Sequence, residues 1–133
     1  MYRQQILDAI RDSVTAIGIT HVQLWNEDIQ FLTEGQPFPT PAIFIEFLPV
    51  QWQTNKESII YANNAQIRLH CITHITEHPM RFQLATQLRK AIRTLQGDNF
   101  DRLLPFEDNT CHNHSELIED TYSFTLRLCL SAR

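Results

Sequence analysis

Hydrophobic residues recur at helical spacing in two parts of the chain. The first stripe lies near the N-terminus and consists of Ile6, Leu7, Ile10, Val14 and Ile17. Gly18 follows it as a natural stop, because glycine readily adopts the conformation that ends many helices. The second stripe begins after Pro79, which suits a first helical position, and ends before Gly97. Its members are Phe82, Ala85, Leu88, Ile92 and Leu95. The two stripes predict two amphipathic helices.

Between the predicted helices, one short apolar run is bounded by prolines. Residues 42–48 read Ala-Ile-Phe-Ile-Glu-Phe-Leu, and the prolines around them are Pro37, Pro39, Pro41 and Pro49. Proline fits neither a helix interior nor a central position in a sheet ladder, so the run is predicted to be a strand with marked ends. Its side chains are apolar on both faces, which predicts that both faces of its sheet are covered. In so small a protein, a second copy is one candidate for that cover.

Other segments alternate apolar and polar residues, as half-buried strands do. They are 19–25, 67–75 and 122–130, and a further short strand is predicted around 103–106. The strands at 42–48 and 67–75 are predicted to form a hairpin, with the polar segment 51–64 as its long exposed connection. The remainder of 98–120 is predicted to be irregular. The resulting order is α-β-β-β-α-β-β. It predicts an α+β fold in which two helices pack on a mostly antiparallel sheet.

Length and composition limit the class of protein. A chain of 133 residues is expected to form one domain spanning 1–133. It has three cysteines, and Cys71 and Cys129 lie in apolar strand-like runs, which favours reduced thiols. Neither a leader sequence at Met1 nor an apolar stretch long enough to cross a bilayer is present. We therefore expect a protein that is soluble and cytoplasmic at synthesis.

Charge is segregated along the chain, although the net charge is only −4. Residues 80–96 carry four basic side chains and no acid; they are Arg81, Arg89, Lys90 and Arg93. Residues 98–120 are acidic, with Arg102 as the one base; the acids are Asp98, Asp101, Glu107, Asp108, Glu116, Glu119 and Asp120. Two interpretations carry equal weight: the two segments neutralise each other within one subunit, or they make complementary contacts between subunits.

Motifs for catalysis are missing from the sequence. The three glycines are scattered singly, so they form neither a phosphate loop nor a dinucleotide fingerprint, and no nucleophile elbow or paired-histidine zinc motif occurs. His70 and His74 lie on a predicted strand, roughly 13 Å apart, too far for a shared metal. Cys111, His112 and His114 form a second cluster in a predicted loop, where a solvated loop is favoured over a metal site. We expect no catalytic residues, no metal and no cofactor.

Candidate partner contacts lie in two regions. In or beside the polar connection, Trp52, Lys56 and Tyr61 are either ordinary hairpin side chains or anchors for another protein. The basic helix and the acidic segment after it supply the remaining candidates. These are Arg81, Arg89, Lys90, Arg93, Asp98, Asp101, Glu107 and Asp108.

The order of elements, read with three local patterns, resembles the tail terminator proteins of long-tailed phages, also called minor tail protein U. The patterns are the Pro39–Ile45 entry into a strand, the Ala65–Cys71 strand that runs toward a helix, and the terminal Asp120–Leu126 strand. Small head-tail joining proteins of the same phages share similar layouts. The resemblance covers nearly the whole chain, and it places the chain in the broader neck group more firmly than among the terminators.

The resemblance implies a non-enzymatic protein that forms a ring, commonly a hexamer, in the virion tail or neck. There it would end tail-tube polymerisation and join tail to head, with the tail-tube and head-completion proteins as partners and DNA passing through the ring. Loop 51–64 would face the tube or lumen. Two other functions remain alternatives: a nucleic-acid-binding module that uses the basic second helix, and a small metal-dependent enzyme that uses the histidines. The acidic balance speaks against the former.

Overall fold

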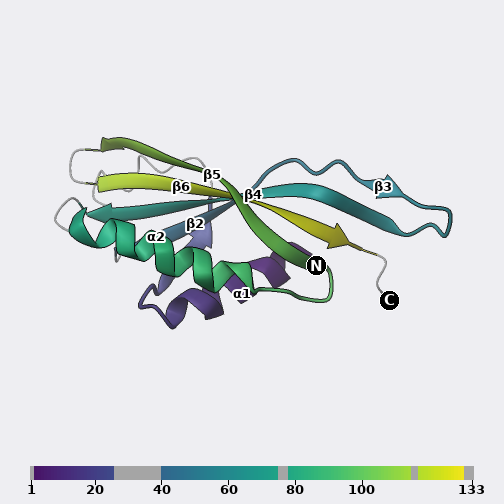
Figure 1. The fold of residues 1–133 in the computed structure, drawn as a ribbon, viewed down its shortest axis with the longest axis horizontal. Helices are drawn as coiled ribbons and strands as arrows, with labels where there is room; N and C mark the ends of the chain where they lie inside the picture. The colour runs from purple at the N-terminus through teal and green to yellow at the C-terminus, as the bar shows by residue number, and fades with distance from the viewer. Residues whose placement is uncertain (1, 26–39, 75–77, 115–116, 131–133) are drawn as a thin grey trace.

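Six strands and two helices make up the part of the chain that a computed structural model describes, namely residues 2–25, 40–74, 78–114 and 117–130. The elements follow one another as α1 (Tyr2–Thr15), β1 (His21–Leu24), β2 (Ala42–Phe47), β3 (Gln53–Thr54), β4 (Ile60–His74), α2 (His78–Arg93), β5 (Phe100–His114) and β6 (Leu117–Cys129). Both helices lie on the same side of the sheet (Figure 1). The predicted α+β class and order of elements are confirmed, with the two-residue β3 as an addition.

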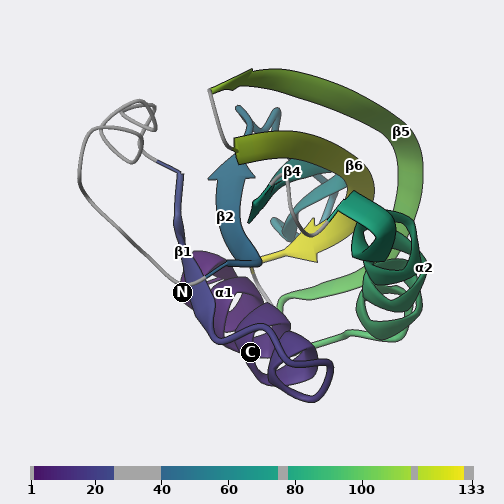
Figure 2. The ribbon, with the colours of Figure 1, turned by 90° about the vertical axis from the view of Figure 1, so that its left-hand side faces the viewer.

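The sheet has the order β1-β2-β4-β6-β5, and β3 pairs with the first two residues of β4, Ile60 and Tyr61. Only the β1–β2 pair is parallel; the other pairs are antiparallel, as predicted. Three register shifts interrupt the pairing of β5 with β6. Such bulges bend a strand, and Figure 2 shows how strongly β5 and β6 curve.

The two faces of β2 have different surroundings. Ile43, Ile45 and Phe47 point toward the main core, which contains the buried residues of both helices. Ala42 and Phe44 point the other way and form a small second cluster with Ile72. The helices therefore cover one face of this strand, while local packing buries part of the other face, which was also predicted to be covered.

The main core joins the helices to the alternating side chains of β4 and β6. In α1 the predicted residues Ile6, Leu7, Ile10 and Val14 are buried, and Gly18 ends this part of the chain with a φ of 93°. In α2 the buried apolar residues are Leu84, Ala85, Leu88 and Ile92. Phe82 was predicted to be in the core, and this is wrong: it is 66% exposed. It lies six residues before Leu88, roughly 120° away around the helix axis, whereas Leu84 shares the face of Leu88.

Two predicted irregular regions are strands, which corrects the sequence-based boundaries. The connection 51–64 is shorter than predicted, because β4 begins at Ile60. The segment after Gly97 contains the 15-residue β5 in place of a short strand at 103–106 and a loop at 111–114. The side chains of 111–114 lie outside the described residues, as do Pro37, Pro39 and Glu116. The bulges in β5 disturb its alternation, and Pro105 is tolerated because β5 is an edge strand.

Candidate interaction surfaces

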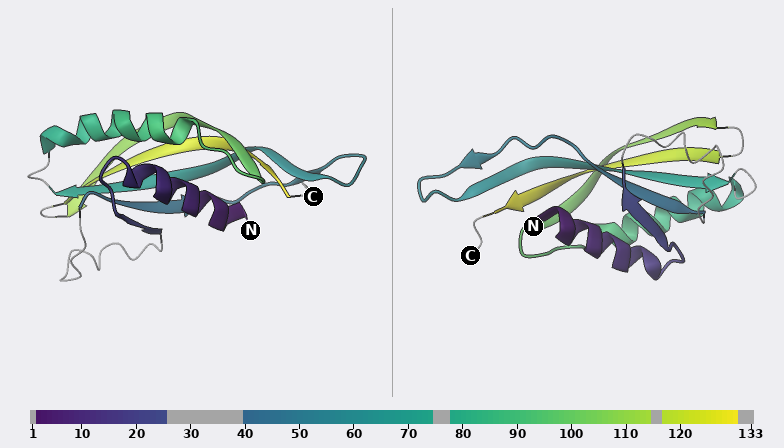
Figure 3. Two further views of the ribbon diagram at one scale, coloured as in Figure 1. Left: turned by 90° about the horizontal axis from the view of Figure 1, so that it is seen from below. Right: turned by 180° about the vertical axis from the view of Figure 1, so that it is seen from behind.

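A hairpin arm, formed by β3, the turn at 55–59 and the first residues of β4, extends beyond both helices (Figures 1 and 3). Asn55 shapes its turn, since its side-chain oxygen accepts hydrogen bonds from the backbone N–H groups of Glu57 and Ile59 at 2.8 and 3.0 Å. Lys56 is exposed at this turn. The arm thus presents a polar tip away from the core.

Two predicted contact residues, Trp52 and Tyr61, lie near the base of the arm. Trp52 packs edge-on against Tyr2 of α1, with ring centroids 5.7 Å apart, and remains 36% exposed. Tyr61 lines an open hollow of about 390 Å³ together with Asp98 and Asp101. The structure therefore brings three of the predicted contact residues to one hollow between the arm and the start of β5.

Two arginines of the basic helix bind acids of the neighbouring strands. The guanidinium of Arg81 donates to both carboxylate oxygens of Asp120, at 2.8 and 3.3 Å, and both side chains are buried. Arg89 forms an ion pair with Asp108 and lies over the ring of Tyr122. Burial raises the pKa of the Tyr122 hydroxyl, so this ring stays neutral beneath the arginine. For these two arginines, the basic and acidic segments neutralise each other within one subunit.

Asp101 forms a second ion pair at the other end of β5. Arg127 donates to its two carboxylate oxygens at 2.8 and 2.6 Å. The hydrogen bond from Arg127 lowers the pKa of Asp101 below its usual value, although burial opposes the shift. Lys90, Arg93, Asp98 and Glu107 are exposed, and among the described residues none of them has an ion-pair partner. Their roles in contacts between subunits stay predictions.

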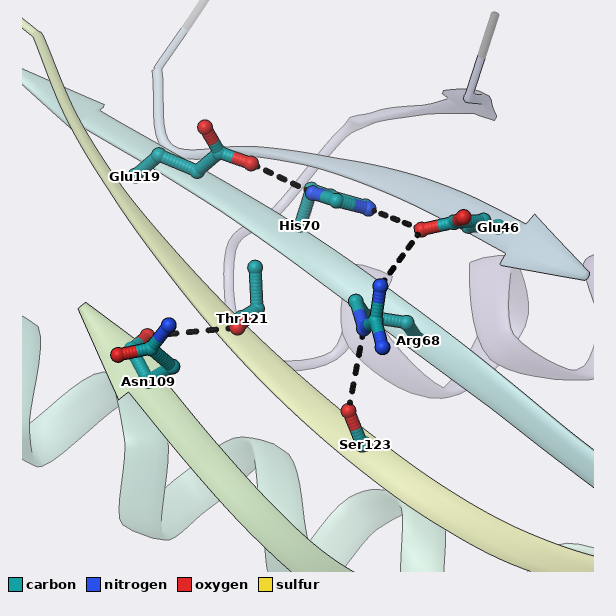
Figure 4. Close-up of polar contacts among 7 residues, drawn as sticks. All are labelled: Glu46, Arg68, His70, Asn109, Glu119, Thr121 and Ser123. Carbon is teal, nitrogen blue, oxygen red and sulfur yellow. Dashed lines mark hydrogen bonds and ion pairs between the residues drawn. The ribbon is translucent and has the colours of Figure 1, made fainter. Parts of the chain in front are cut away.

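A polar network crosses the sheet face opposite the helices (Figure 4). His70 of β4 lies at its centre: Nδ1 is 2.5 Å from a carboxylate oxygen of Glu119 on β6, and Nε2 is 2.8 Å from one of Glu46 on β2. Arg68 donates to the same Glu46 oxygen at 3.4 Å and to Ser123 at 3.3 Å. These side-chain contacts connect the three central strands of the sheet, β2, β4 and β6.

The network is largely removed from water. His70 is 5% exposed, and Glu119 and Ser123 are also buried. The indole of Trp25, which directly follows β1, stacks on the imidazole. One ring therefore bridges a buried acid, Glu119, and a half-buried acid, Glu46, on the two strands that flank β4. Such cross-strand contacts suit a role in holding the strands in register.

Sequence reasoning missed this network, although one signal for it was present. Glu46 is the one charged residue in an otherwise apolar strand. The predicted strands also placed His70 on a polar face, and the predicted hairpin of 42–48 with 67–75 is confirmed by the antiparallel pairing of β2 with β4. The pairing of β4 with β6, which brings Glu119 to His70, was not predicted. Among the described residues, no three histidine, cysteine or acidic side chains converge on a metal position. No described helix is long and apolar enough to cross a membrane.

Comparison with known proteins gives a similarity of fold. No family model matches the chain, and no curated protein matches its sequence. One similar solved structure is a chain from the virion of a native gene transfer agent particle, with a TM-score of 0.55 and 12% sequence identity. The similarity covers 96% of this chain and 91% of that chain. At this identity, the similarity shows a shared fold along nearly the whole of both chains.

Proposed function

We propose that this protein is a structural component of a phage or phage-like virion, and more specifically a tail terminator or a close neck relative that assembles into a ring. The observation that carries the proposal is the shared fold with a chain of a gene transfer agent virion, which extends over 96% of this chain. The local sequence patterns at 39–45, 65–71 and 120–126 support the same group of proteins.

The surfaces suit an adaptor that works by contact. The hairpin arm projects from the body and offers polar groups, with Lys56 exposed at its turn (Figure 1). In this proposal the arm reaches the tail tube, and the exposed charges of α2 and β5 face neighbouring subunits. The ring, with six copies as the expected number, ends tube polymerisation, binds a head-completion protein and lets DNA pass. It forms in the host cytoplasm before joining the virion.

The test measures assembly with and without tail tubes. Sedimentation velocity and native mass spectrometry at low salt are expected to show a closed oligomer, and purified tubes are expected to stop elongating once the protein caps their ends. A protein that stays monomeric over the full concentration range and leaves tube length unchanged contradicts the proposal.

Variants of α2 test whether this helix lies between subunits. Lys90 and Arg93 are the suitable positions, because both are exposed, whereas Arg89 is bound to Asp108 within the subunit. Lys90→Glu with Arg93→Glu is expected to weaken assembly, and the neutral pair Lys90→Gln with Arg93→Gln is expected to have an intermediate effect. Unchanged assembly in both variants assigns α2 to a surface outside the ring contacts.

A further inference from the structure

Exposed apolar side chains lie at both edges of the sheet. β5 forms one edge, where Leu104 and Phe106 are 47% and 49% exposed. β1 forms the other edge, where Leu24 is 52% exposed. Edge strands offer unpaired backbone groups, and natural proteins usually protect them with charge or bulges. Exposed apolar side chains at two opposite edges are therefore candidate contacts with another chain.

The β5 edge forms a knob made of Leu104, Phe106 and Glu107. Phe106 lies in a register shift between Pro105 and Glu107, and a bulge of this kind turns a side chain out of the regular pleat. Glu107 follows it and is exposed. Asp108 is bound to Arg89, whereas Glu107 has no ion-pair partner among the described residues. The knob is thus an aromatic side chain beside a free negative charge.

The opposite edge contains a notch of matching character. It is a hollow of about 290 Å³, lined by Arg3, Gln4, Leu7, Leu24, Trp25, Ile45, Glu46 and Phe47. β1 pairs with the first four residues of β2, and among the described residues no strand pairs with Glu46 and Phe47 on this side. The volume lies just below the about 300–1,000 Å³ typical of small-molecule sites, which suits a single large side chain.

The rim of the notch carries a free positive charge. The guanidinium of Arg3 lies 5.4 Å from the ring of Phe47, and among the described residues it has no carboxylate partner. The acid in the notch, Glu46, is already bound to His70 and Arg68. The notch is therefore an apolar hollow with an available cation, which is complementary to the knob.

We infer that the knob of one copy of this chain docks into the notch of the next, with Phe106 in the hollow and Glu107 against Arg3. The occupant is a second copy because this chain carries both halves of a complementary pair. Knob and notch are different surfaces, so the contact is head-to-tail; repeated contacts of this type form a ring when the rotation between successive copies closes, and a filament when it does not. The inference rests on the proposed ring function and names the surfaces that build the ring.

Removal of the aromatic side chain tests the apolar half of the contact. Phe106→Ser is expected to raise the protein concentration needed for half-assembly at least about tenfold, as loss of a buried aromatic anchor does. Leu130→Ser is the matched control, because Leu130 is a similarly exposed apolar side chain, at 42%, that belongs to neither the knob nor the notch. It is expected to leave assembly unchanged. Circular dichroism confirms that both variants are folded.

Charge reversal tests the orientation of the contact. Arg3→Glu and Glu107→Arg each place like charges across every contact, so each single variant is expected to assemble more weakly. The double variant restores opposite charges and is expected to recover assembly. Asp12→Arg controls for a change in net charge at an exposed position of α1.

The outcomes separate the two proposals. A wild-type protein that never assembles, with or without tubes, contradicts the proposed function. A wild-type protein that assembles normally, and whose Phe106→Ser, Arg3→Glu and Glu107→Arg variants assemble equally well, overturns the docking inference alone. Single charge variants that weaken assembly without recovery in the double variant also overturn the head-to-tail pairing.

Discussion

The rings of Trp25 and His70 lie parallel, with an interplanar angle of 6° and centroids 3.7 Å apart. The indole covers one face of the imidazole, and Glu46 and Glu119 bind its two nitrogens in the ring plane. A histidine held on its face and at both nitrogens has few alternative positions. It fixes β2, β4 and β6 to one another on the side of the sheet that the helices leave free.

Replacement of His70 should destabilise the fold strongly. His70→Leu leaves the buried Glu119 carboxylate without its hydrogen-bond partner, and an unsatisfied buried polar group costs about 1–3 kcal/mol, more when it is charged. Urea unfolding measures the free energy of unfolding. Addition of Glu119→Gln to His70→Leu should recover part of the loss, because the uncompensated charge is then absent. Equal stability of wild type and His70→Leu would contradict the structural role of the network.

Fluorescence should report the ring stack directly. The chain has two tryptophans, so Trp52→Phe leaves Trp25 as the single indole. In that background, His70→Ala uncovers one face of Trp25 and should shift its emission to longer wavelength. Arg68→Ala retains the stack and serves as the control, with little expected shift. The same spectrum before and after His70→Ala would place Trp25 away from His70.

Two ion pairs of similar geometry should differ in their effect on stability. Asp120→Ala removes the buried carboxylate to which Arg81 donates two hydrogen bonds, which is expected to cost about 3 kcal/mol. Asp101→Ala breaks a pair whose two side chains are 36% and 46% exposed, so a much smaller loss is expected. Thermal or chemical unfolding of the two variants makes the comparison. Similar losses would contradict the burial of the Arg81–Asp120 pair.

The contribution of Asp101 should depend on pH. Because Arg127 lowers the pKa of Asp101 in the folded state, this carboxylate stabilises the fold above its unfolded-state pKa of about 3.9. The stabilisation is lost as the pH falls through the lower folded-state pKa. Asp101→Asn should therefore be slightly less stable than wild type at pH 7, and the difference should vanish at a pH below the folded-state value. Unfolding midpoints across this range, at low salt, test the prediction.

Gly18 should be needed for its backbone conformation alone. Its φ is 93°, and a Cβ there would meet no atom within 4 Å. Gly18→Ala is expected to cost about 1 kcal/mol through backbone strain. Gly18→Asn should cost less, because asparagine tolerates a positive φ better than alanine does. An alanine variant as stable as wild type would show that the segment after α1 readily changes conformation.

Sequence periodicity predicted the elements where burial alone determines the pattern. The residues of α1 and the alternation in β2 and β6 place apolar side chains on the faces that the structure buries. The prediction was wrong where a polar side chain replaces an apolar one on a buried face. Arg81 takes the place toward the sheet that was assigned to Phe82, because Asp120 compensates its charge.

The predicted boundaries of β5 were wrong for a different reason. Bulges shift the side-chain alternation of β5 by one residue at several positions, so no simple period remains in 98–120. The knob at Phe106 and the notch beside Phe47 were likewise unpredictable. Each depends on which strand forms an edge of the sheet, and strand order is not encoded in the period of any one segment.

The α+β class, the order of the elements and the segregation of basic and acidic segments can be read from the sequence alone. These properties follow from local spacing, since a residue's position in a helix or strand sets the face it occupies. The folded structure is needed to show which charges pair, that His70 joins Glu46 to Glu119, and which apolar side chains remain exposed at the sheet edges. Those relationships connect residues 24 to 49 positions apart in the His70 network, and they depend on pairing between distant strands.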